Sequence, residues 1–127
     1  MKKFKVRIYI FIAAAAVISI FVYWGSLPPA SGKYDDFAKC IKDSGAIFYG
    51  AFWCPHCQNQ KAMFGNSAQL LPYVECSLPS GSGQTSVCIA NGIKGYPTWV
   101  FKDGSQLSGE IPLVTLSEKT GCALLQQ

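Results

Sequence analysis

The sequence predicts an α/β fold in which a mixed central sheet has helices on both faces, preceded by one transmembrane helix. Three features of the 127 residues lead to this prediction. A long apolar run without charge follows the N-terminus. Helical and strand-like segments then alternate between residues 34 and 125, which favours a sheet covered by helices. Asp103-Gly104 is a strong hairpin-turn signal, so the last two strands should pair antiparallel.

The N-terminal segment has the pattern of a signal-anchor. Its basic residues are Lys2, Lys3, Lys5 and Arg7. Residues 8–24 carry no charge, and a helix of this length nearly spans a hydrocarbon core of about 30 Å. We expect a cytoplasmic segment at 1–7, an anchor at 8–27, a linker at 28–33 and an extracytoplasmic domain at 34–127. The alternative is a cleaved signal peptide, although Val22-Tyr23-Trp24 is a poor cleavage site.

Charge and composition limit the class of protein. Hydrophobic residues make up 50% of the chain, which argues against disorder. The net charge is +4, and the basic residues before residue 8 account for all of it, because seven lysines balance seven acids in the rest of the chain. The folded domain therefore lacks the basic face that nucleic-acid binding needs.

The elements of the domain follow from apolar patterns and from turn residues. Phe37 and Ile41 share one face of the first helix, and the strand at 46–52 is apolar on nearly every residue, as in a central strand. Gly92 is a plausible left-handed helix cap. The predicted order is helix 34–43, strand 46–52, a Cys-X-X-Cys helix that breaks at 65–66 and resumes at 67–71, strand 73–77, helix 85–91, strand 98–102, strand 106–109 and helix 112–125.

Cys54-Pro55-His56-Cys57 lies between the first strand and the next helix. The helix N-terminus favours a thiolate, so we expect Cys54 to be the nucleophile. Cys57, on the first turn, can resolve a mixed disulfide and should be more buried. A protonated His56 would stabilise the thiolate and make the disulfide more oxidising, although this histidine could also be an inert surface residue. A purely structural disulfide here would restrict little of the unfolded chain.

The other four cysteines also lie beyond the anchor, as expected in a disulfide-forming compartment. We predict a structural disulfide between Cys76 and Cys88, which enclose a loop rich in glycine and serine, with a second redox pair as the alternative. Cys40 and Cys122 are then left to pair with each other, to stay free or to bind a partner. A zinc site made of Cys54, Cys57, Cys76 and Cys88 is the main non-redox alternative. We expect no bound metal or other cofactor.

Trp53-Cys54-Pro55-His56-Cys57 after the first strand, together with Gly95-Tyr96-Pro97-Thr98 before the hairpin, resembles the thioredoxin fold over residues 34–125. More narrowly, residues 49–57, 73–76, Cys88 and 92–99 resemble the thioredoxin-like domain that accompanies vitamin K epoxide reductase-type membrane proteins. The resemblance implies a three-layer sandwich. Residues 44–74 contain no Asp or Glu, so the buried acid that thioredoxins carry before the motif is missing.

The resemblance also implies roles for residues near the motif. Pro97 corresponds to a cis-proline that faces the active site and exposes the Tyr96 backbone to a substrate peptide. Trp53 and Tyr96 would form an apolar rim for that peptide, whereas Trp99 is expected in the core.

We therefore expect a membrane-anchored, extracytoplasmic thiol–disulfide oxidoreductase. Its substrates would be exported proteins that contain cysteines, and its electrons would pass to a quinone-linked membrane partner of the vitamin K epoxide reductase type. The alternatives are a disulfide reductase or isomerase, and a metal-binding assembly factor.

Overall fold

The computed structural model describes residues 2–26 and 30–124. The chain divides into two compact units, residues 1–30 and residues 31–127. The expected anchor at 8–27, linker at 28–33, final helix at 112–125 and domain at 34–127 each include residues outside the described ranges. The two units are described separately below.

The first unit is one helix, α1 (Lys2–Gly25). Its segment Ile8–Gly25 is long and apolar enough to cross a membrane, and no part of it is buried against other residues. Inside this segment the hydroxyl of Ser19 donates to the carbonyl of Ala15 at 2.8 Å, so its one clearly polar side chain is satisfied within the helix. The helix is therefore compatible with a single membrane crossing.

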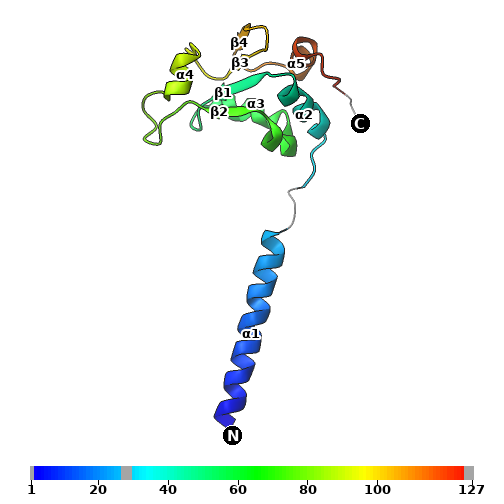
Figure 1. The fold of residues 1–127 in the computed structure, drawn as a ribbon, viewed down its shortest axis with the longest axis vertical. Coiled ribbons are helices and arrows are strands. Elements are labelled where there is room, and N and C mark those ends of the chain that lie inside the picture. The colour runs from blue at the N-terminus through cyan, green and yellow to red at the C-terminus, as the bar shows by residue number, and fades with distance from the viewer. Residues whose placement is uncertain (1, 27–29, 125–127) are drawn as a thin grey trace. The chain divides into compact units, whose positions relative to one another are not determined.

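The second unit is a small sheet with helices around it (Figure 1). Each predicted helix and strand has a counterpart in it, in the predicted order. Its described elements are α2 (Asp35–Asp43), β1 (Ile47–Gly50), α3 (Pro55–Ala62), the 3-10 helix η1 (Gly65–Leu70), β2 (Tyr73–Glu75), α4 (Ser86–Ala90), β3 (Thr98–Val100), β4 (Gln106–Ser108) and α5 (Leu113–Thr120).

The sheet has the strand order β2-β1-β3-β4. Strand β1 pairs parallel with β2 and antiparallel with β3, and β3 pairs antiparallel with β4. The predicted α/β fold with a mixed central sheet is thus confirmed. Because β1 lies between β2 and β3, the residues that follow it leave the sheet at the end of a central strand.

The alternation of side chains along β1 divides the core into two layers. Phe48 points to one face, where its ring stacks on Trp99 with 4.8 Å between centroids, and Ile41 of α2 and Leu116 of α5 pack in the same cluster. Tyr49 points to the other face and packs in a second cluster with Cys88 of α4. Helices therefore cover both faces, as in a thioredoxin-like three-layer sandwich.

Several predicted elements are too long. The strand expected at 73–77 ends at Glu75, because the Glu75 carboxylate accepts the N–H of Ser77 at 2.8 Å and Ser77 then pairs with Gln84 instead. The helix expected from residue 112 ends at Thr120, because Gly121 adopts a left-handed conformation with φ 72°. The strand expected at 46–52 ends at Gly50, since the chain then turns toward Cys54.

Candidate active site

Cys54 lies where the chain leaves β1 and enters α3. It is the N-cap residue, with φ −81° and ψ 116°, and Pro55 occupies the first turn, where its missing N–H removes no helical hydrogen bond. The Cys54 side chain is only 4% exposed, and its Sγ lies 3.6 Å from the carbonyl oxygen of Tyr96. The Cys54 sulfur is thus held at the start of a helix and against the Tyr96 backbone.

Cys57 lies one turn further and is completely buried. Burial raises the pKa of the Cys57 thiol to about 12, with a hydrogen bond from the Ala51 backbone acting in the opposite direction. Cys57 is therefore a neutral thiol at neutral pH when reduced. Cys54 and Cys57 are the unpaired cysteines among the described residues, and both are buried.

The space beside Cys57 depends on Gly50. A Cβ placed on Gly50 would lie 3.0 Å from Cys57 Sγ and 2.8 Å from Cε2 of Tyr73. The sulfur and the Tyr73 ring therefore approach the β1 backbone from the same side, where a side chain would fill the gap. Glycine is required at position 50 because the Tyr73 ring and Cys57 Sγ lie too close to its Cα for a Cβ to fit without moving one of them.

The Tyr73 side chain is hydrogen-bonded to an acid, Glu75. Its hydroxyl donates to Glu75 Oε2 at 2.7 Å, while Glu75 Oε1 accepts the backbone N–H groups of Phe52 and Ser77. Burial raises the pKa of Tyr73, and the bonded Glu75 carboxylate raises it further. The stretch before the motif contains no acid, but Glu75, half-buried and opposite Gly50 in the parallel register, supplies one from the neighbouring strand. Residue order gave no signal for this, because the contact depends on strand pairing.

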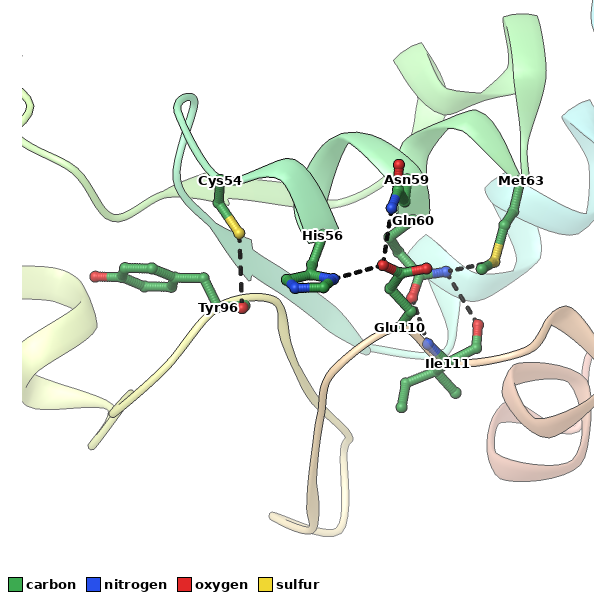
Figure 2. A network of polar contacts seen from close by, with 8 residues as sticks. All are labelled: Cys54, His56, Asn59, Gln60, Met63, Tyr96, Glu110 and Ile111. Carbon is green, nitrogen blue, oxygen red and sulfur yellow. Dashed lines mark hydrogen bonds and ion pairs between the residues drawn. The ribbon is translucent and has the colours of Figure 1, made fainter.

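His56 is paired with Glu110, a residue that the sequence analysis did not select (Figure 2). His56 Nδ1 lies 2.7 Å from Glu110 Oε1, and Asn59 Nδ2 donates to the same oxygen at 2.9 Å. These hydrogen bonds, from Asn59 first and then from His56, lower the pKa of Glu110. His56 is mostly exposed and Glu110 is less so, with side-chain exposures of 69% and 29%.

The segment that carries Glu110 is fixed to both halves of the site. The buried Gln60 side chain of α3 accepts the N–H of Ile111 at 2.6 Å and donates to its carbonyl at 3.0 Å. On the other side, the N–H of Gly109 donates to the carbonyl of Pro97 at 2.9 Å. Residues 109–111 therefore join the motif helix to the loop that faces Cys54.

The structure places Trp53, Tyr96 and Pro97 together around Cys54. The Tyr96–Pro97 peptide bond is cis, and Pro97 is fully buried. Trp53 is 52% exposed and meets the Tyr96 ring edge-on, with 6.0 Å between centroids. The Tyr96 hydroxyl accepts from Gln84 at 2.9 Å, which fixes the ring. Trp99 lies in the core, as predicted.

The other four cysteines form two disulfides. Cys76 and Cys88 are joined on the α4 face of the sheet, with 5.6 Å between Cα atoms. Cys40 and Cys122 are joined across 82 residues of sequence, with 5.8 Å between Cα atoms. A four-sulfur metal site would need free Cys76 and Cys88 thiolates, and both sulfurs are bonded. In residues 2–26 and 30–124 no cluster of three His, Cys, Asp or Glu side chains has metal-binding geometry.

Comparisons with known proteins agree with a thiol-based site. No family model matches the chain. The chain is 46% identical over 93 residues to the thiol-disulfide oxidoreductase LTO1 of Arabidopsis thaliana. The match covers 70% of this chain but only about a quarter, 24%, of that protein. This similarity supports membership of a thioredoxin-like redox group and a redox function for cysteines of this chain.

Proposed function

We propose that this chain is a membrane-anchored thiol–disulfide oxidoreductase that acts outside the cytoplasm through Cys54 and Cys57. The observation that carries the proposal is the state of its cysteines: four are bonded in pairs, while these two are free at the start of α3. The similarity to the Arabidopsis thiol-disulfide oxidoreductase supports the reaction class, and the apolar helix Ile8–Gly25 supports anchoring. No cofactor is needed for exchange between thiols and disulfides.

We propose the oxidative direction, with electrons leaving exported proteins. A substrate thiolate attacks Sγ of Cys54 in the Cys54–Cys57 disulfide, and Cys57 leaves and takes up a proton. A second substrate thiolate then attacks the substrate sulfur of the mixed disulfide and releases Cys54. The substrate has lost two electrons and two protons and gained a disulfide, and the site is now a dithiol.

Reoxidation uses Cys57 as the resolving thiol. The Cys54 thiolate attacks a disulfide of a membrane partner, and Cys57 attacks Cys54 in the resulting mixed disulfide, which frees the partner as a dithiol. The partner, of the vitamin K epoxide reductase type, passes the two electrons to a quinone. The exposed Trp53 and the fixed Tyr96 ring are suited to contact the peptide around the substrate cysteine.

A trapping experiment tests the exchange mechanism. In cells that express full-length Cys57→Ala, mixed disulfides between Cys54 and the partner protein that reoxidises it should accumulate, because Cys57, the thiol that resolves them, is gone. The matched control is Cys54→Ala/Cys57→Ala, which should form none. The absence of adducts with the single variant would show that Cys54 does not exchange with proteins.

A redox titration of the full chain tests the direction. An oxidase should be clearly more oxidising than thioredoxin, so a midpoint potential near about −270 mV would indicate a reductase instead. Metal analysis of anaerobically purified protein separates a further alternative, since stoichiometric zinc or copper on Cys54 and Cys57 would indicate an assembly factor.

A further inference from the structure

Glu110 receives two hydrogen bonds from one face of the motif helix. His56 and Asn59 are three residues apart on α3, so their side chains project to the same side. Both reach Oε1 of Glu110, at 2.7 and 2.9 Å (Figure 2). The carboxylate is therefore bound to the helix that presents Cys54, although it lies more than 50 residues later in the sequence.

The position of this carboxylate is set by its neighbours in the chain. Ile111 is held by two hydrogen bonds to the buried Gln60 side chain, and Gly109 by one to the Pro97 carbonyl. Glu110 lies between these two anchored residues. Its side chain therefore faces His56 from a fixed segment.

The His56 side chain is oriented by its contact with Glu110. Figure 2 shows the His56 ring between Cys54 and Glu110, with one ring nitrogen directed at Glu110 and the other facing away from it. The hydrogen bond between His56 Nδ1 and the Glu110 carboxylate fixes the orientation of the ring. Glu110 therefore sets the orientation of a ring that belongs to the same motif as both sulfurs.

We propose that Glu110 is a positioning residue of the redox site: it holds the His56 ring in one orientation, and the ring held in this way stabilises the reduced state of Cys54 and Cys57. Stabilising the reduced state makes the disulfide a stronger oxidant. The inference rests on the proposed thiol–disulfide function. It assigns the oxidising tendency to the His56–Glu110 pair and not to His56 alone.

The test is a set of redox equilibria with glutathione, measured on the full-length protein in detergent. Glu110→Gln keeps the shape of the side chain but replaces the charged acceptor of the His56 hydrogen bond with a weaker, neutral one. It should lower the equilibrium constant for oxidation of glutathione by about two- to fivefold, the range for a largely exposed polar pair. Glu118→Gln is the matched control: it removes the same charge from the exposed part of α5 and should cause no change.

The same change is then made in the His56→Ala background, where it should no longer weaken the oxidant, because the group through which Glu110 acts is absent. An equal loss in both backgrounds, or no loss with His56 present, would overturn the inference. Urea denaturation of each variant shows whether it is still folded. A variant that is merely unfolded would lose stability whether or not His56 is present. Glutathione makes the outcome independent of natural substrates: if the potential shifts but Cys57→Ala traps nothing in cells, the proposed function fails and the role of Glu110 stands.

Discussion

Removing the Cys40–Cys122 disulfide should lower the free energy of unfolding by about 4.5 kcal/mol. This bridge ties α2 to the residues after α5 and spans 82 residues of sequence. A cross-link restricts the unfolded chain, and on the chain-entropy model its contribution grows with the logarithm of the enclosed loop. The same relation gives about 3 kcal/mol for Cys76–Cys88, whose sequence separation is 12. The longer bridge should therefore matter more by about 1.5 kcal/mol.

The assay is urea denaturation of the oxidised, full-length protein in detergent, followed by near-ultraviolet circular dichroism. The variants are Cys40→Ala/Cys122→Ala and Cys76→Ala/Cys88→Ala, compared with the unchanged chain. Cys40→Ala alone is the matched control, because opening the loop at either end removes the same restraint. It should lose nearly as much stability as the corresponding double variant.

The order of the two losses decides whether the reasoning holds. Cys76 and Cys88 are both completely buried, so truncating them also leaves small cavities. These cavities reduce the expected difference between the two variants in lost free energy of unfolding. If the Cys76–Cys88 variant is the less stable of the two, loop length does not govern these disulfides. If the Cys40–Cys122 variant loses nothing, the bridge does not restrain the unfolded chain.

Three further predictions concern the motif helix and its neighbours. Gly50→Ala should slow resolution of a mixed disulfide by about 10- to 100-fold, measured with a small disulfide substrate, because its Cβ would meet Tyr73 and Cys57 Sγ at 2.8 and 3.0 Å. Gln60→Leu should lower the free energy of unfolding in urea by about 2–6 kcal/mol, because the buried N–H and carbonyl of Ile111 lose their partners. The reduced protein should lose stability relative to the oxidised protein as pH rises from 9.0 toward about 12, because Cys57 ionises at the lower value when unfolded and at the higher one when folded; equal pH profiles would contradict this.

The order of helices and strands could be predicted because its signals are local. The apolar run before Cys54 and the Asp103-Gly104 turn each determine structure within a few residues. The ends of elements were less predictable. Glu75 ends β2 through its own side chain, and that role depends on where Ser77 lies after folding. Gly121 was a visible stop signal for α5 that the apolar pattern around it outweighed.

The two acids of the site could not be predicted from the sequence for a related reason. Glu75 reaches the site because β2 pairs parallel with β1, in a register that sets it opposite Gly50. Glu110 reaches it because Gln60 binds the backbone of the next residue. Neither belongs to a motif with fixed spacing, whereas Cys54 and Cys57 do. Sequence spacing therefore identified the sulfurs, but the charges around them follow from tertiary contacts.

The contacts of residues 109–111 change how the motif should be interpreted. A histidine between two cysteines can act on them only from a defined position. In this protein the His56 ring is bonded to Glu110, and the position of Glu110 depends on Gln60 and on the carbonyl of Pro97. The same hydrogen bonds that fix the carboxylate also fix the loop against which Cys54 packs. A change in this segment should therefore alter redox potential and substrate access together, even when the motif itself is intact.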